Sequence, residues 1–369
     1  MKRQSPSRTQ LPRIAVALIG YGHAGRVFHA PIIRSLPGFA LQAIVTANPG
    51  RMQQVRDEVP EARTFPTVES LLDGDIHFDL AVIATPSGTH MQLALQCISH
   101  HLHVVVDKPF ALARSDAESV IEAAQQKGVL LSVFQNRRWD GDFLTVQSLL
   151  DHDILGHVHR FESRFERWRP IPRTASWREK PGNDAGGGLL YDLGPHLIDQ
   201  ALMLFGPVAS VYAELDSRRP KSRVDDDDFI ALTHAGGVRS HLSMSQLSAL
   251  PGIRFRMEGE ARALEISGLD PQEEQLLAGL RPGNVSWGTS PPERVVTLGT
   301  RSDATAMDIQ NGSYETFYLR MYDAIMHSAS VPVNPEDSLN VLDIIAACQR
   351  SAAEHTAILL GESPPATLS

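Results

Sequence analysis

Apolar and polar positions follow a helix-and-strand alternation through the first third of the chain. Short apolar runs predict strands, separated by stretches with helical periodicity. The predicted strands are 14–19, 41–46, 80–85, 103–107 and 130–134, and the predicted helices lie near 25–35, 50–58, 88–100 and 115–127. This order is typical of a parallel sheet covered by helices on both faces, which binds its ligand beyond the carboxyl ends of the strands.

The pattern changes after about residue 135. A helix at 141–151, a strand at 158–166, a glycine-rich loop at 182–188 and a helix at 189–205 come first. Longer strands with every second residue apolar follow at 210–216, 228–234, 238–245, 253–259 and 261–267. The stretch 279–312 is rich in Gly, Pro and Ser and predicts an irregular loop, and two helices at 314–328 and 336–359 close the chain. We therefore expect an α/β protein whose second half has an open, mostly antiparallel sheet, covered by helices on one face.

Composition and charge exclude several classes of protein. The 369 residues carry a formal net charge of -9, with a pI near 5.9, which argues against a nucleic-acid partner. No apolar run approaches the roughly 20 residues of a membrane span, and the basic first 13 residues lack the apolar centre of a signal peptide. Cys97 and Cys348 both lie in apolar helical contexts, which favours buried thiols and a cytoplasmic location.

A glycine-rich turn directly after the first predicted strand is the strongest chemical signal. Gly20, Gly22 and Gly25 form Gly-x-Gly-x-x-Gly, with His23 and Ala24 inside the motif. The first glycine permits a tight turn, the second lets the backbone approach a pyrophosphate, and the third lets helix and strand pack closely. An ordinary structural turn is the alternative, but the position after a buried strand favours a dinucleotide site.

The residues after the second strand bear on the choice of dinucleotide. A carboxylate there would bind the ribose 2′-hydroxyl of NAD and repel a 2′-phosphate. This chain has Thr46, Asn48 and Arg51 instead, a hydroxyl, an amide and a guanidinium that can hold a phosphate dianion. We expect NADP to be favoured, with NAD still possible and a plain turn as the alternative.

Two further strand ends carry polar groups at the expected ligand edge. Thr85 and Pro86 follow one strand and would border the cofactor, while His90 either joins them or begins an ordinary helix. Asp107 and Lys108 end the next strand. A lysine beside an oxidised nicotinamide is easier to deprotonate and can exchange a proton with a substrate hydroxyl, whereas a solvated surface lysine is the alternative.

The fourth cluster follows the glycine run at 186–188. Asp192 and His196 are four residues apart, so we expect them on one helix face, where they suit proton relay to a substrate oxygen. A structural histidine bonded to its neighbour is the alternative. The pair also resembles half a metal site, but no further ligand at suitable spacing supports one, and we expect no metal.

These motifs in order resemble the Gfo/Idh/MocA family of NAD(P)-dependent oxidoreductases, and the resemblance covers about residues 12–360. Within the family, the segments VVDKPF and YDLGPHLIDQALMLFG are most similar to scyllo-inositol dehydrogenase-like members that use NADP. The resemblance implies that Lys108 contacts substrate and nicotinamide, with a Lys108–Pro109 bond that is cis in many relatives. It also implies that Asp192 and His196 bind substrate and transfer the proton. By the same resemblance, a segment near cofactor and substrate comprises Asn136, Arg137, Arg138 and Trp139.

The resemblance implies a complete arrangement. We expect a disordered tail at 1–12, a Rossmann domain at 13–135 and a substrate-binding and oligomerisation domain at 136–369, whose last helices can pack back on the first domain. The expected reaction transfers a hydride between NADP and a ring carbon of a cyclic polyol or sugar, with His196 removing the hydroxyl proton, assisted by Asp192 and Lys108. A dehydrogenase of another sugar and a non-catalytic NADP sensor are the alternatives. One sheet face needs cover, so we expect a homodimer or homotetramer.

Overall fold

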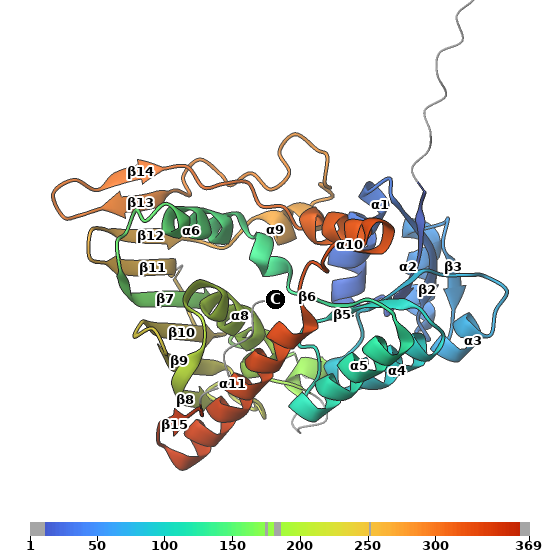
Figure 1. Cartoon of the computed structure of the whole chain (residues 1–369), viewed down its shortest axis with the longest axis horizontal. Coiled ribbons are helices and arrows are strands. Elements are labelled where there is room, and N and C mark those ends of the chain that lie inside the picture. The colour runs from blue at the N-terminus through green and yellow to red at the C-terminus, as the bar shows by residue number, and fades with distance from the viewer. Residues whose placement is uncertain (1–11, 174–175, 181–185, 251, 362–369) are drawn as a thin grey trace, which may run out of the picture.

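The computed structural model describes residues 12–173, 176–180, 186–250 and 252–361. Residues 1–11 of the expected tail and residues 182–185 of the glycine-rich loop expected at 182–188 lie outside the described residues. In the described part, two sheets stand side by side, one in each half of the chain (Figure 1). The predicted fold class, α/β with a Rossmann sheet and a second, mostly antiparallel sheet, is confirmed.

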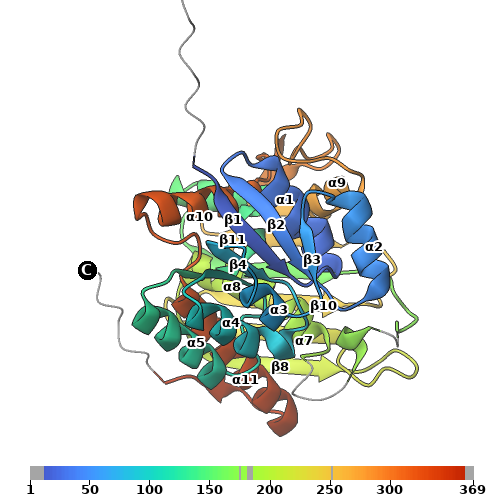
Figure 2. The same cartoon turned by 90° about the vertical axis from the view of Figure 1, so that its right-hand side faces the viewer.

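The first sheet has six parallel strands in the order β3-β2-β1-β4-β5-β6. Its strands are β1 (Ile14–Ile19), β2 (Phe39–Val45), β3 (Arg63–Phe65), β4 (Leu80–Ile83), β5 (His103–Asp107) and β6 (Leu131–Phe134). Its helices are α1 (Ala30–Ser35), α2 (Pro49–Glu58), α3 (Val68–Leu72), α4 (His90–Ser99) and α5 (Arg114–Lys127), with a π-helical turn η1 (Ala24–His29) before α1 (Figure 2). The strand order reverses between β1 and β4, and open sheets of this kind bind ligands at that switch point.

The second sheet has nine strands in the order β14-β13-β12-β11-β7-β10-β9-β8-β15, all antiparallel except for the β7–β10 pair. Its main strands are β7 (Val158–Glu166), β8 (Val208–Asp216), β9 (Asp227–His234), β10 (Arg239–Ser245), β11 (Ile253–Gly259) and β12 (Ala263–Ser267). Three short strands complete it: β13 (Val296–Gly299), β14 (Thr305–Met307) and β15 (Ile358–Leu359). Every second side chain of β9 is buried, because α6 (Gly141–Asp151), α8 (Gly194–Phe205) and α11 (Pro335–Glu354) cover one face (Figure 1).

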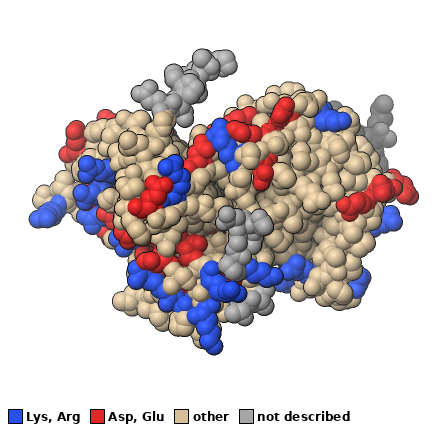
Figure 3. Space-filling model, turned by 90° about the horizontal axis from the view of Figure 1, so that it is seen from below, with Lys and Arg blue, Asp and Glu red and all other residues tan. Residues whose placement is uncertain are grey.

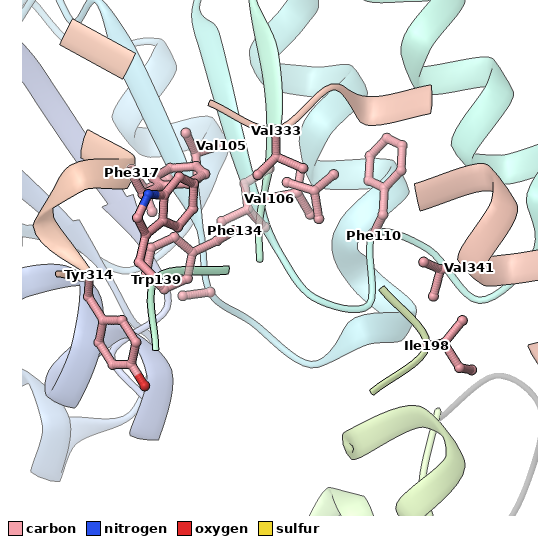
Figure 4. Packing of buried hydrophobic residues seen from close by; sticks show 14 of the residues in the cluster. Val105, Val106, Phe110, Phe134, Trp139, Ile198, Tyr314, Phe317, Val333 and Val341 are labelled. Atoms are coloured by element: carbon pink, nitrogen blue, oxygen red, sulfur yellow. The ribbon is translucent and has the colours of Figure 1, made fainter. Parts of the chain in front are cut away.

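An apolar junction joins the two halves. The ring of Phe134 at the end of β6 meets Phe317 of α10 (Glu315–His327) edge-on at 4.9 Å, and Trp139 packs on Phe317 at 5.9 Å (Figure 4). The helix α11 contacts both α5 of the first sheet and β8 of the second, and α10 contacts α1. These contacts fix the position of one sheet edge against the other half of the chain.

Three secondary-structure predictions are wrong. The stretch 279–312 is not wholly irregular, because the short strands β13 and β14 extend the sheet beyond β12, with β14 at the edge. The last helix ends at Glu354, and residues after it form β15 against β8. Ser351 stabilises that ending, since its hydroxyl accepts from the Ala213 N–H of β8 (2.9 Å) and donates to the Thr356 carbonyl (2.7 Å).

The expected helix 189–205 is divided into α7 (Leu189–Asp192) and α8. Pro195 lacks an N–H and cannot bond the carbonyl four residues earlier, so the helix is interrupted at Leu193. Asp192 therefore ends one short helix and His196 lies in the first turn of the next. The prediction that they share one face of a single helix is wrong.

Both cysteines are free and buried, as expected. None of the helices in the described ranges is long and apolar enough to cross a membrane. The described residues also contain no group of three or more His, Cys, Asp or Glu side chains that could hold a metal ion, and the absence of a metal stays a prediction.

Candidate active site

The glycine turn has the backbone that the sequence motif predicts. Gly20 has φ +100°, a conformation that disfavours a side chain. A Cβ at Gly25 would overlap the Gly20 carbonyl oxygen, so helix and strand approach closely only because the residue is glycine. A Cβ at Gly22 would meet nothing within 4 Å. The turn thus leaves open space over Gly22, where the backbone can approach a pyrophosphate.

A cavity of about 330 Å³ lies beside this turn. It is lined by residues of the first domain, among them Gly20, Thr46, Arg51 and Thr85. Thr46 is buried after β2 and Arg51 is exposed, whereas Asn48 caps α2 by accepting from the Arg51 N–H at 3.0 Å. One carboxylate, Glu69, also lines the cavity. The cavity thus has a hydroxyl and a guanidinium at the position that decides between the two dinucleotides.

His90 is enclosed by the turns that follow β4 and β5. Its Nδ1 lies 2.9 Å from the Pro109 carbonyl oxygen and its Nε2 lies 3.0 Å from the Thr85 carbonyl oxygen. Burial lowers the pKa of its imidazole. In this structure both ring nitrogens face backbone carbonyl oxygens, so His90 holds the turn at Thr85 and Pro86 against the turn at Lys108 and Pro109. A direct contact of His90 with a cofactor stays a prediction.

Lys108 brings the two domains together. It follows β5, its bond to Pro109 is cis, and its Nζ donates to the Asp192 carbonyl and lies 3.3 Å from Asp192 Oδ1. Arg178 Nε donates to the same carboxylate oxygen at 2.9 Å. Burial, together with the charge of Arg178, lowers the pKa of the Lys108 ammonium. Burial alone would raise the pKa of the Asp192 carboxyl. The charges of Lys108 and Arg178 outweigh this effect and hold that pKa well below its usual range.

His196 lies just behind this ion pair. It is 5% exposed, and burial followed by the charges of Lys108 and Arg137 lowers the pKa of its imidazole well below the ordinary value. Its ring is therefore neutral at pH 7. Nδ1 is buried and has no hydrogen-bond partner among the described residues. His196 is not among the described side chains that line the main cavity, so it is set back from Lys108 and Asp192.

The segment after β6 faces two ways. Asn136 and Arg137 line a cavity of about 530 Å³ together with His23, Ala24, Asp107, Lys108 and Asp192. Arg138 faces the interior and pairs with Asp199 Oδ1 at 2.6 Å. Trp139 packs in the apolar junction described above. Both residues thus contribute to contacts between the two halves, and their expected contact with the cofactor stays a prediction.

The sequence reasoning missed much of the cavity wall. The additional charged residues are Arg167, Arg169, Arg173, Arg178, Glu179, Arg219, Asp225 and Glu273. Glu273, in α9 (Gln272–Leu277), reaches His23 of the glycine turn at 3.3 Å, so it also bridges the domains. The signal in the sequence was the spacing of Arg167 and Arg169, two residues apart directly after a predicted strand. Such spacing places both side chains on one face.

Comparison with known proteins agrees with this architecture. Residues 14–135 match a family model described as an oxidoreductase family with an NAD-binding Rossmann fold, and residues 143–265 match the GFO/IDH/MocA C-terminal domain. The chain is 34% identical to scyllo-inositol 2-dehydrogenase (NADP(+)) IolW of Bacillus subtilis, over 96% of this chain and 98% of that protein. It is 37% identical to the uncharacterized oxidoreductase YdgJ of Escherichia coli, over 94% and 99%. The solved structure of the putative oxidoreductase yvaA from Bacillus subtilis superposes with a TM-score of 0.88 at 34% identity, covering 96% of this chain and all of that one.

Proposed function

The chain belongs to the Gfo/Idh/MocA family of NAD(P)-dependent oxidoreductases, and from that premise we propose that it is an NADP-dependent dehydrogenase of a cyclic polyol or sugar. The bond oxidised is a ring CH–OH, as the name of the Bacillus subtilis relative indicates for that protein. A dehydrogenase of another sugar derivative is the alternative that shares this site.

One observation carries the proposal. Lys108, at the ligand edge of the first sheet, meets Asp192 of the second domain on the wall of the main cavity. A polar pair of this kind next to the glycine turn suits proton transfer to or from a substrate hydroxyl. A protein that only senses a dinucleotide has no need of this pair, which weighs against the sensor alternative.

The residues present fit the cofactor. The open space over Gly22 suits a pyrophosphate, Thr46 and Arg51 would hold the 2′-phosphate, and Ala24 and Lys108 line the cavity where the nicotinamide half belongs. When bound, the oxidised nicotinamide accepts the hydride from the hydroxyl carbon.

The chain's own residues manage the proton. The Asp192 carboxylate, kept ionised by Lys108 and Arg178, accepts a hydrogen bond from a substrate hydroxyl or fixes the lysine beside it. Lys108, with its lowered pKa, lies at the cavity wall and can exchange a proton with that hydroxyl. His196 is neutral behind the pair and able to take the proton onward. Reduction uses the same groups in reverse.

A substrate screen tests the proposal. Inositols and aldoses are assayed with NADP and with NAD by the absorbance of the reduced cofactor. Turnover of at least one ring polyol or sugar with NADP is the expected result. Tight NADP binding with no turnover across a broad panel would instead support the sensor alternative. A cytoplasmic location and a homodimer or homotetramer remain predictions that go with this function.

A further inference from the structure

Two arginines form a basic wall of the main cavity on the side of the second sheet. Arg167 and Arg169 directly follow β7, and their backbone N–H groups donate to the carbonyls of Ser245 and Gln246, each at 2.8 Å. Trp168 between them is 57% exposed and pairs with Leu247 on the neighbouring segment. Because side chains alternate along an extended strand, both arginines lie on the same side, and both line the cavity. We call Arg167 and Arg169 the arginine pair.

Two other arginines of the cavity, Arg178 and Arg219, already have close acidic partners. Arg178 lies 2.9 Å from Asp192, and Arg219 lies 2.9 Å from Glu179 and 3.0 Å from Asp226. These side chains are held by the protein and have little charge left for a ligand.

The arginine pair is poorly neutralised by comparison. Among the described residues, the one carboxylate within ion-pair distance of Arg167 is that of Glu273, at 3.5 Å. This carboxylate also lies 3.4 Å from Arg137 and 3.3 Å from His23, so Arg167 shares its charge with two other groups. Arg169 has no ion pair within the described ranges. Burial, together with the charges of Arg169 and Arg137, lowers the pKa of Arg167, which is the direction expected of a cation with too few anions around it.

The cavity as a whole has more basic than acidic groups. Seven of its described lining residues are Lys or Arg and five are Asp or Glu, in a chain with a net charge of -9. Basic side chains also gather in the lower middle of the surface seen in Figure 3. A cavity that reverses the sign of the protein's charge attracts anions.

The wall is also held in place. Arg167 and Arg137 both lie over the ring of Phe165, with guanidinium-to-centroid distances of 4.8 and 4.5 Å. Arg167 is near enough to Asp192 to lower the pKa of that carboxylate, so the wall and the Lys108–Asp192 pair belong to one cavity.

We propose that the substrate carries an anionic group, a phosphate or a carboxylate, which the arginine pair binds while Lys108 and Asp192 receive the ring hydroxyl. Guanidinium groups match both anions with paired N–H donors. The proposal rests on the proposed function and narrows its substrate class from neutral polyols and sugars to their acidic derivatives. The cofactor's phosphates belong at the glycine turn of the first domain, whereas the arginine pair extends from the second sheet.

Calorimetry on the NADPH-loaded protein tests the site without turnover, because the reduced cofactor cannot accept a hydride from the sugar. The probes are glucose, glucose 6-phosphate, glucuronate and inorganic phosphate. We expect glucose 6-phosphate or glucuronate to bind at least tenfold more tightly than glucose. Whichever of these two sugars has the lower dissociation constant shows whether the site recognises a phosphate or a carboxylate. In Arg167→Gln and Arg169→Gln this preference should fall by about tenfold or more, the loss of one charge-assisted contact. Arg167→Lys should restore part of it.

Arg160→Gln is the matched control. Arg160 is an exposed arginine of β7, seven residues before Arg167, so its alternation places it on the opposite face. The anion preference should be unchanged in this variant. Equal binding of glucose and both anionic sugars by the unmutated protein, or a preference that survives both glutamine variants, would overturn the anion site.

Turnover separates the two proposals. The same sugars are assayed for NADP reduction. The ratio of kcat/KM for an anionic sugar to kcat/KM for glucose should follow the binding preference. Anion binding that depends on the arginine pair, without oxidation of any sugar, would support the anion site while contradicting the dehydrogenase function. Oxidation of neutral and anionic sugars with equal kcat/KM would do the opposite.

Discussion

Nζ of Lys108 lies 3.3 Å from Oδ1 of Asp192, although 84 residues separate them in the sequence. Lys108 directly follows a strand of the parallel sheet, and Asp192 ends a short helix packed against the antiparallel sheet. Neither half of the chain therefore contains the candidate site by itself. The apolar junction around Phe134 and Phe317 packs the two halves against each other.

The lysine gives the first prediction. Lys108→Met should lower kcat for polyol or sugar oxidation by about 10²-fold or more, the usual scale for general acid–base assistance. The dissociation constant of NADPH, measured by its fluorescence, should change little, because the glycine turn and the cavity beside Thr46 are intact. Wild-type turnover in this variant would contradict the role of Lys108. As a control, Lys127→Met removes an exposed lysine at the end of α5 and should leave both constants unchanged.

The pH profile gives the second prediction. Oxidation requires a deprotonated acceptor, so kcat/KM should rise with pH through the pKa of that group. The pKa of His196 is lowered below 6.5 and that of Lys108 below 10.5. A limb below pH 6.5 therefore reports His196, and one at higher pH reports Lys108. In His196→Ala we expect kcat to fall by about 10²-fold and the limb below pH 6.5 to disappear. An unchanged acidic limb in that variant would exclude His196 as the proton acceptor.

Much of the fold follows from local patterns in the sequence. The six-stranded sheet was predictable except for β3, because its strands are short apolar runs separated by helices, and β3 has three residues of which only Phe65 is buried. The short strands β13 and β14 were missed because they lie within a Gly- and Pro-rich stretch, where β13 pairs with β12 and β14 pairs with β13. Tertiary pairing overrides local propensity in such segments.

The residues of the site that directly follow a predicted parallel strand could be predicted from the sequence. Gly20 and Lys108 each follow a parallel strand, and all such ends share one edge. Arg138 and Trp139 show the limit of that reasoning, because they follow the same strand end but pair with Asp199 and pack on Phe317 instead of lining the cavity. Arg167 was not found because it comes from the other sheet, and its place at the cavity depends on how the two halves pack.

Cofactor choice gives the third prediction. Thr46 and Arg51 line the cavity beside the glycine turn, and no carboxylate follows β2. We expect a higher kcat/KM with NADP than with NAD. Arg51→Ala should reduce this preference by about tenfold, because one charge-assisted contact contributes roughly 1–2 kcal/mol. Arg56→Ala, on an exposed part of the same helix, is the control. Equal or better efficiency with NAD in the unmutated protein would show that the prediction is wrong.

The second sheet gives the fourth prediction. Helices cover one face, and the side chains of β9 and β10 on the other face are partly exposed, Phe229 among them. Sheets with such a face commonly bury it in a subunit contact. Light scattering at micromolar concentration should give a mass of two or four chains of 40.5 kDa. A mass of one chain at that concentration would rule out the dimer and the tetramer, while leaving the fold unaffected.

Arg138 gives the last prediction, which separates support of the fold from contact with the cofactor. Its guanidinium lies 2.6 Å from Asp199 and 3.0 Å from Asp337, and the side chains of Arg138 and Asp199 are only 9% and 4% exposed. Arg138→Met leaves Asp199 buried without its partner, which destabilises a protein by about 3–5 kcal/mol. Denaturant unfolding should report this loss, while the KM for NADP of the folded variant should stay within about twofold of the original value.

The pH dependence of that loss checks its cause. Burial raises the pKa of Asp199, and the charge of Arg138 opposes the rise. Without the arginine, the pKa of Asp199 in the folded state rises further above its value in the unfolded state. The variant therefore loses stability as the pH increases from the unfolded-state pKa of Asp199 to its folded-state pKa. The deficit relative to the unmutated protein should therefore be smaller at pH 5 than at pH 8. Asp337→Asn removes the half-exposed partner and should cost much less at either pH, since Asp199 remains paired. If Arg138→Met had an unchanged free energy of unfolding and a tenfold higher KM for NADP, Arg138 would contact the cofactor and would not stabilise the fold.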